Sequence, residues 1–275
     1  MTTTQPQEAK DQYIFHGTNL AKGRHISISP QNSSMKHLFY GRIILDSEVP
    51  SADFESGTSE IGLICLSGEC VIDTDGESNT IKQHDSIYIP RDSTIRITTG
   101  STVDLAECSA GVDNVYPLQV VRYADVKDDA SLSFDTGGAS NKRRVNITLG
   151  KNIDAGRILA GFTTSDPGNW TSFPPHEHAK MLEELYVYYD MPSPAFGIQL
   201  VYTSPDEPEF VGIVRDGDAV VMPQGFHPNV SVPGHPINFV WMMAAHREVE
   251  DRQFGVVNLQ PGFETAGTGL ESSRE

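Results

Sequence analysis

Apolar and polar residues alternate along most of this chain, and short clusters of turn-forming residues separate the alternating stretches. Residues 61–77, IGLICLSGECVIDTDGE, contain two such stretches, the first followed by Ser-Gly and the second by Asp-Gly. A period of two places successive side chains on opposite faces of a strand, and both dipeptides favour turns. The pattern therefore predicts strand, turn, strand and turn in this segment, and it continues through residues 80–110.

The same alternation resumes after a polar, glycine-containing stretch at residues 128–144 and runs to residue 245. No long window repeats its apolar residues with the 3.6-residue period of a helix. A chain made of short strands must close its sheets or stack them to protect their edges. The pattern therefore predicts an all-β protein built from barrels or sandwiches.

A weak internal repeat refines this prediction. Residues 81–98 can be laid over residues 214–231 without a gap, so that a turn, a strand ending in Pro, a tight loop and a second strand occur twice. We interpret the repeat as two copies of one barrel, an N-terminal barrel in residues 1–140 and a C-terminal barrel in residues 141–275. A chance similarity between two β-hairpins is the alternative.

Composition and charge limit the classes of partner. The 275 residues suffice for two domains of ordinary size, and 38% of them are hydrophobic, enough for a substantial core. The formal net charge of −17 argues against binding to nucleic acid or to an anionic membrane surface. If the substrate is an anion, local Arg or Lys side chains must overcome this background.

The cysteines and the N-terminal segment indicate a cytoplasmic protein. Cys65, Cys70 and Cys108 are an odd number without the spacing of a metal site, and they suggest no disulfide framework. Residues 1–17 contain no apolar run like that of a signal peptide. No stretch approaches the length of a transmembrane helix.

The densest cluster of chemical groups surrounds two histidines. His176 and His178 are two residues apart, so on a strand both imidazoles emerge from one face and form half of a site for a borderline metal. A carboxylate pair follows shortly, and His227 lies farther along the chain in a Pro-Gly turn next to a strand. Paired surface histidines without a metal are the alternative interpretation.

Strand alternation distinguishes the two neighbouring carboxylates. Glu183 and Glu184 are adjacent, so on a strand they face opposite ways, and only one can join the histidines. Glu184 shares its face with Tyr186 and Tyr188, which favours this set for the cavity side. We therefore predict Glu184 as the ligand and Glu183 as a solvated charge on the other side, with Glu183 as ligand if a loop shifts the register.

This set predicts one catalytic metal ion in the C-terminal half. Three imidazoles and one carboxylate leave two positions open on a six-coordinate ion, and an open position distinguishes a catalytic site from a structural one. Zinc, manganese and iron suit these ligands. The internal repeat places Thr94 opposite His227, so the N-terminal barrel is expected to lack the metal ligands.

The motifs PPHEHAKMLEE at residues 174–184 and GDAVVMPQGFHP at residues 217–228 resemble the two motifs of the cupin superfamily. More narrowly, the chain resembles the bicupin family that contains 5-deoxyglucuronate isomerase of inositol catabolism and 5-dehydro-4-deoxyuronate isomerase of pectin catabolism. The resemblance extends from about residue 15 to residue 260. It implies two double-stranded β-helix (jelly-roll) barrels and an aldose–ketose isomerase of a deoxy sugar acid. The strand after the second motif departs from the family pattern, so either sugar remains open.

The implied reaction is the conversion of 5-deoxy-glucuronate to 2-deoxy-5-keto-gluconate in inositol catabolism. It needs a metal to polarise the carbonyl and a base to move a proton between neighbouring carbons. The polar candidates for a catalytic role are Tyr186, Tyr188, Gln199 and Tyr202. Core packing is an equally good interpretation of each. The candidates for the substrate carboxylate are Arg247 and Lys180.

Two other functions use the same ligands. A cupin dioxygenase can hold iron through three histidines and a glutamate, and a regulatory cupin can bind a sugar without turnover. The fused, metal-free first barrel argues against the dioxygenase, and the lack of a DNA-binding segment argues against the regulator. We expect a small sugar-acid substrate, a homo-oligomer, and no nucleic acid or membrane partner.

Overall fold

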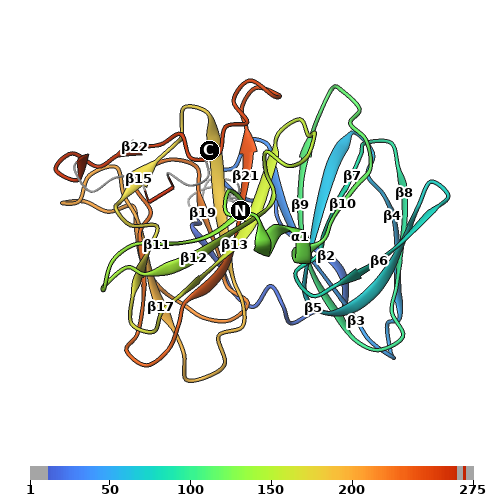
Figure 1. The fold of residues 1–275 in the computed structure, drawn as a ribbon, viewed down its shortest axis with the longest axis horizontal. Coiled ribbons are helices and arrows are strands. Elements are labelled where there is room, and N and C mark those ends of the chain that lie inside the picture. Colours follow the sequence, from blue (N-terminus) through green and yellow to red (C-terminus); the bar gives the residue numbers. More distant parts are fainter. Residues whose placement is uncertain (1–11, 265–268, 271–275) are drawn as a thin grey trace, which may run out of the picture.

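The structure, a computed structural model, describes residues 12–264 and 269–270. It is almost entirely β-structure, with the short helix α1 (Tyr123–Asp128) between two groups of strands (Figure 1). The all-β bicupin fold that the alternating pattern and the resemblance predict is therefore confirmed. No helix in the described part of the chain is long and apolar enough to cross a membrane.

Strands β2 to β10 form the first barrel, drawn in blue to green in Figure 1. Their bounds are β2 (Gly23–Ile28), β3 (Leu38–Leu45), β4 (Ser51–Glu55), β5 (Ser59–Thr74), β6 (Glu77–Lys82), β7 (Ser86–Ile89), β8 (Thr94–Thr98), β9 (Val103–Gly111) and β10 (Gln119–Val121). The sheet order is β10-β7-β5-β9-β3-β2, and β4, β6 and β8 complete it through β5 and β8. A cluster of buried aliphatic side chains, including Ile43, Leu63 and Ile95, fills its interior.

One predicted turn in this barrel is wrong. β5 runs without interruption through Ser67 and Gly68, with a register shift between Cys65 and Ser67. Gly68 has φ of +80°, and a Cβ there would lie 2.0 Å from the carbonyl oxygen of Thr102, so the Ser-Gly pair permits a bulge and a close contact. The second predicted turn is confirmed, since β5 and β6 form a hairpin across Asp75 and Gly76.

The remaining strands form the second barrel, drawn in yellow-green to red, together with β1 from the start of the described chain. Their bounds are β1 (Ile14–Phe15), β11 (Ser133–Thr136), β12 (Arg143–Leu149), β13 (Ile158–Ser165), β14 (Trp170–Thr171), β15 (His176–Glu177), β16 (Leu182–Tyr188), β17 (Gly197–Val201), β18 (Phe210–Val214), β19 (Ala219–Met222), β20 (Asn229–Ser231), β21 (Asn238–Ala245) and β22 (Asn258–Leu259). A seven-stranded sheet, β1-β19-β16-β21-β13-β12-β11, faces the four-stranded sheet β14-β20-β17-β18, and β15 pairs with β22.

The internal repeat coincides with equivalent strands of the two barrels. β7 and β19 stand at matched positions of the repeat, and each pairs antiparallel with an equivalent neighbour, β5 or β16. In the same way β9 and β21 lie on the other side of β5 and β16. The division of the chain at residues 140 and 141 stays a prediction.

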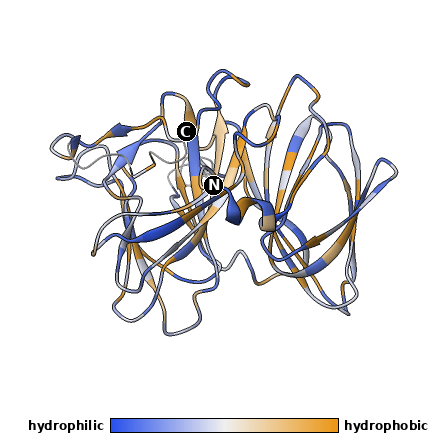
Figure 2. Cartoon of the chain, viewed as in Figure 1, coloured by the Kyte–Doolittle hydropathy of each residue, from blue (hydrophilic) through white to orange (hydrophobic). Residues whose placement is uncertain are grey.

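The two barrels share one hydrophobic cluster. It joins buried residues of the first barrel, such as Leu38 and Ile64, to buried residues of the second, such as Leu159 and Leu185. Strands β5 and β9 contact β13 and β21 across this interface. Hydrophobic colours accordingly mark the strands in the middle of the view, where the barrels meet (Figure 2). The seven-stranded sheet is therefore covered on one face by the first barrel, and its other face lines the interior of the second.

Candidate metal centre

β16 is the central strand of the candidate site because it lies between β19 and β21. Glu184 is paired in register with Met222 on one side and Met243 on the other. The alternation along β16 directs Glu184 and Tyr186 into the second barrel, where both line one cavity. It directs Leu185 and Val187 into the hydrophobic cluster shared with the first barrel.

The three histidines come from two segments of the chain, and two of them reach Glu184. His176 lies on β15, and His178 follows in the loop that leads into β16. His227 lies just before β20, two residues after Gly225. Gly225 has φ of +93°, and a Cβ there would lie 2.8 Å from the carbonyl oxygen of Tyr202, so glycine suits this tight turn. The Pro-Gly turn thus places His227 next to the carboxylate on β16.

Three of the four predicted ligands form a close group. The ligand atoms of His178, Glu184 and His227 all lie within 4.8 Å of one another, and all three residues are buried. Nε2 of His178 is 2.8 Å from Oε2 of Glu184, and Nε2 of His227 is 3.0 Å from the same oxygen. His176 is outside this group, but its ring centroid is 5.0 Å from that of His227.

Backbone carbonyls determine the tautomer of all three imidazoles. Nδ1 of His176 is 3.0 Å from the carbonyl oxygen of Pro174, Nδ1 of His178 is 3.3 Å from that of Leu182, and Nδ1 of His227 is 2.9 Å from that of Gly225. A carbonyl oxygen only accepts, so each Nδ1 carries a proton and donates it. Each Nε2 is then the atom available to a metal, which is the usual arrangement of metal-binding histidines.

One of these nitrogens has an unsatisfied lone pair. Nε2 of His227 is buried and makes no hydrogen bond within the described residues, because its approach to Glu184, although only 3.0 Å, is not directed as a hydrogen bond. Buried polar atoms without a partner are uncommon in native proteins. A cation between His227 and Glu184 would satisfy both groups, so the atoms present fit a metal ion.

The electrostatics of the cluster follow from burial and from the single carboxylate. Burial, together with the nearby His227, lowers the pKa of His176 to about 3. Burial would also lower the pKa of His178, but the charge of Glu184 and the hydrogen bond to it raise this pKa above its usual value. Burial would raise the pKa of Glu184, but the attraction and hydrogen bond of His178 lower it to about 2. Glu184 is therefore ionised at neutral pH.

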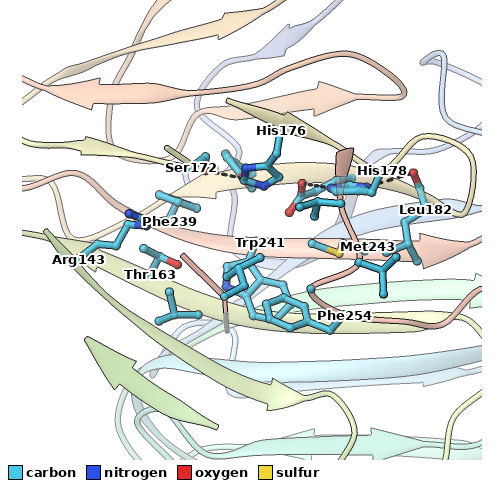
Figure 3. A pocket seen from close by; sticks show the side chains of 17 residues that line it. Arg143, Thr163, Ser172, His176, His178, Leu182, Phe239, Trp241, Met243 and Phe254 are labelled. Atoms are coloured by element: carbon cyan, nitrogen blue, oxygen red, sulfur yellow. Dashed lines mark hydrogen bonds and ion pairs between the residues drawn. The ribbon is translucent and has the colours of Figure 1, made fainter. Parts of the chain in front are cut away.

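A cavity of about 520 Å³, including its open mouth, adjoins this cluster. Its polar lining consists of His176, His178, Glu184, Tyr186, Ser172, Thr163 and Arg143. In Figure 3, His178 lies on one side of the cavity, and Arg143 and Thr163 lie on the other. Aromatic and aliphatic side chains form the rest of the wall, and they include Trp241, Phe239, Met243 and Phe254. The cavity thus combines a metal-binding end with a largely apolar wall and a few polar groups, as ligand sites commonly do.

The predicted catalytic residues occupy different places. Tyr186 lines the cavity, and its hydroxyl is 2.7 Å from that of Ser172. Tyr188 is fully buried, and its hydroxyl donates to Oε1 of Gln199 over 2.5 Å. Nε2 of Gln199 donates to the carbonyl oxygen of His227 over 2.9 Å. Tyr188 and Gln199 are not among the described residues that line the cavity. They form a hydrogen-bond chain that ends on the backbone of His227.

The two residues predicted to bind a carboxylate lie outside the cavity. The side chain of Arg247 is 62% exposed, and its Nη2 is 2.6 Å from Oδ1 of Asp251. Lys180 is exposed in the loop between the two motif histidines and β16. Tyr202 donates to Oε1 of Gln260 over 2.6 Å. None of these three is among the described residues of the cavity wall.

The sequence analysis missed most of the cavity wall, including Arg143 and Trp241, and misjudged one carboxylate. Arg143 and Trp241 line the cavity, and the alternation of their strands was the available signal, but it did not reveal which faces meet. The prediction that Glu183 is a solvated charge is wrong, because only 1% of Glu183 is exposed. Its carboxylate accepts hydrogen bonds from three backbone N–H groups of the first barrel.

Sequence comparison gives a family match and several relatives. The model of the KduI/IolB family matches residues 14–257. A protein of Bacillus subtilis (strain 168) named 5-deoxy-glucuronate isomerase is 30% identical over 220 residues, which are 70% of this chain and 79% of that protein. One of Lacticaseibacillus casei with the same name is 27% identical over 260 residues, 86% of this chain and 93% of that one. For the relative from Geobacillus kaustophilus, at 29% identity, the match spans only 58% of its length.

Structure comparison supports the fold. The chain is similar to the crystal structure of an IolB-like protein from Salmonella typhimurium LT2, with a TM-score of 0.79 and 21% identity over 90% of this chain and 97% of that one. It is also similar to the oxalate decarboxylase of Lactobacillus farciminis, with a TM-score of 0.61 and 11% identity over 84% and 86% of the two chains. At these identities the likeness concerns the fold alone.

Proposed function

Because this chain belongs to the KduI/IolB family, we propose that it is a metal-dependent isomerase of a deoxy sugar acid, converting 5-deoxy-glucuronate to 2-deoxy-5-keto-gluconate in inositol catabolism. The observation that carries the proposal is the approach of Nε2 of His178 and Nε2 of His227 to one oxygen of Glu184, at 2.8 and 3.0 Å, beside a cavity that His176 also lines. The names of the relatives support the choice of substrate. The alternative substrate is 5-dehydro-4-deoxyuronate.

The residues that would hold the metal are His176, His178, Glu184 and His227. Their donor set, three imidazoles and one carboxylate, suits Zn²⁺, Mn²⁺ or Fe²⁺. When bound, the ion supplies a Lewis acid for the carbonyl oxygen of the sugar. The described N-terminal barrel has no comparable group, which supports one ion per chain.

The chain's own residues serve the proton transfer in distinct ways. Isomerisation moves one proton from the hydroxyl-bearing carbon to the carbonyl carbon and another between the two oxygens. Burial raises the pKa of Tyr186 well above its usual value, so this phenol stays protonated. Tyr186 can therefore donate a hydrogen bond to a substrate oxygen, and the hydroxyl of Ser172 orients it. The apolar wall around Trp241 limits access of water to the reacting carbons.

Other expectations belong to the same proposal. A cytoplasmic location is supported by Cys65, Cys70 and Cys108, which are all buried free thiols. A small sugar-acid substrate follows from the proposed reaction. The homo-oligomer and the division into residues 1–140 and 141–275 remain predictions.

The proposal is tested with purified protein loaded with Zn²⁺, Mn²⁺ or Fe²⁺ and incubated with each of the two deoxyuronates. We expect NMR to show conversion of 5-deoxy-glucuronate without oxygen, nicotinamide or ATP. The matched control is His176→Ala combined with His178→Ala, which should convert neither sugar. Conversion of 5-dehydro-4-deoxyuronate alone would change the substrate. Oxygen consumption in place of isomerisation would overturn the activity in favour of a dioxygenase.

A further inference from the structure

We infer that Arg143 binds the carboxylate of the substrate, at the part of the cavity away from His178. This inference rests on the proposed function, because it assigns the acid group of the sugar to one side chain. It also assigns an orientation, with the reacting carbonyl at the metal cluster and the carboxylate at the arginine.

Arg143 is a buried part of the cavity wall. Arg143 begins β12, and the alternation of this strand places Arg143 and Val145 on the cavity side. Only 4% of Arg143 is exposed, so its charge is directed into the protein rather than into bulk water. In Figure 3, Arg143 lies beside Thr163 and Phe239 on one side of the cavity, and His178 lies on the other. Its side chain is thus built into the wall of the proposed substrate site.

The cavity wall contains few charged side chains. Among the described residues of the wall, Arg143 is the one arginine or lysine, and Glu184 is the one carboxylate. The chain has a net charge of −17, so an anionic substrate needs a local cation to enter. A metal ion held by the histidine cluster would be one such cation, and it would serve the carbonyl of the sugar. Arg143 supplies the second at a separate place.

The guanidinium group of Arg143 suits a carboxylate ligand. Nη1 of Arg143 donates to the carbonyl oxygen of Asn141 over 3.0 Å, which orients the planar group. A guanidinium has five N–H donors in a fixed fork and matches a carboxylate with two parallel hydrogen bonds. Thr163, on the neighbouring strand, adds a hydroxyl to the same part of the wall. A point charge such as lysine cannot reproduce this two-pronged contact.

The next residue provides a matched control. Arg144 is on the opposite face of β12, its side chain is 40% exposed, and its Nη1 is 3.3 Å from Oδ1 of Asp135. Arg143 and Arg144 therefore have the same charge and adjacent positions, but only Arg143 lines the cavity.

The test compares Arg143→Met with Arg144→Met in metal-loaded protein. For the deoxyuronate, we expect Arg143→Met to raise KM by about 100-fold, the loss typical of a buried charge-assisted pair, and Arg144→Met to leave it unchanged. For the neutral sugar with a hydroxymethyl group in place of the carboxylate, both variants should behave like wild type. Arg143→Lys should restore part of the lost affinity. A wild-type KM for the acid in folded, metal-loaded Arg143→Met would overturn the inference and leave the proposed function intact.

A binding measurement separates the inference from the reaction. Calorimetry with D-glucuronate and D-glucose as probes needs no turnover. We expect wild type and Arg144→Met to prefer glucuronate and Arg143→Met to lose that preference, with equal metal content in all three. This result in a protein that isomerises neither deoxyuronate would uphold the carboxylate site and overturn the proposed function. Equal binding of glucuronate and glucose by wild type would overturn the inference.

Discussion

Glu60 and Glu183 occupy equivalent positions in the two barrels, and each carboxylate binds three consecutive backbone N–H groups of the other barrel. Glu60 accepts from Gly156, Arg157 and Ile158 at 2.8, 2.6 and 2.8 Å. Glu183 accepts from Lys36, His37 and Leu38, each at 2.7 Å. The equivalence follows from the register, because Glu60 is paired with Ala110 on β9 and Glu183 with Ala244 on β21.

This reciprocal arrangement connects the metal-free barrel to the metal cluster. Each carboxylate holds the segment that enters the equivalent strand of its partner barrel, β13 or β3. The residue after Glu60 is Ile61, whereas the residue after Glu183 is Glu184. The first barrel therefore anchors the strand that carries the proposed carboxylate ligand.

The first prediction concerns stability. We expect Glu60→Gln and Glu183→Gln each to lower the free energy of unfolding by about 3 kcal/mol, because an amide cannot accept three hydrogen bonds at buried donors. Denaturant unfolding measures the change. Since the positions are equivalent, the two losses should be similar. A loss below about 0.5 kcal/mol in either variant would show that these bonds do not hold the barrels together.

The second prediction separates the two adjacent carboxylates. Glu184→Gln should weaken metal binding by about 100-fold or more, because it removes the one charged ligand. Glu183→Gln should keep metal in the protein that remains folded, because its side chain faces the first barrel. Metal analysis after dialysis distinguishes them. Metal retained in Glu184→Gln and lost in Glu183→Gln would contradict the assignment.

The third prediction concerns pH. Burial would lower the pKa of His178, but the charge of Glu184 and the hydrogen bond to it raise this pKa above its usual 6.5, so metal-free protein keeps a proton on His178 to higher pH than a free imidazole does. A metal must displace this proton, so binding should release about one proton and weaken as pH falls through that pKa. The pKa of His176, about 3, adds no proton at these pH values. Calorimetry in buffers of different ionisation enthalpy measures the release. Affinity independent of pH between about pH 6 and 8 would contradict this prediction.

The fourth prediction concerns the cysteines. Burial raises the pKa of Cys70 to about 12 and shifts those of Cys65 and Cys108 upward as well. The thiolate is the reactive form, so a thiol reagent at pH 8 should modify none of the three in folded protein and all three after denaturation. Rapid modification of native protein would show that one of these thiols is accessible.

Much of the fold could be predicted from the sequence, because alternation determines which side chains share a face. Alternation places Glu184 and Glu183 on opposite faces of their strand, so it separates the predicted ligand from its neighbour. It did not predict the burial of Glu183 or the cavity position of Arg143, since these depend on how the two barrels and their faces meet. Arg247 was predicted to bind the substrate carboxylate, but it pairs with Asp251 instead. Asp251 lies four residues after Arg247, so a partner for this arginine was visible in the sequence.

The central claim is that one divalent ion on the C-terminal barrel makes this chain an isomerase. The most direct measurement is a titration of chelator-treated protein with Zn²⁺, Mn²⁺ or Fe²⁺, in which conversion of 5-deoxy-glucuronate is followed by NMR. We expect no conversion without metal, a rate proportional to added metal, and a plateau at about one equivalent per chain. Full activity in metal-free protein, or no conversion at full occupancy of the His176, His178, Glu184 and His227 site, would contradict the account.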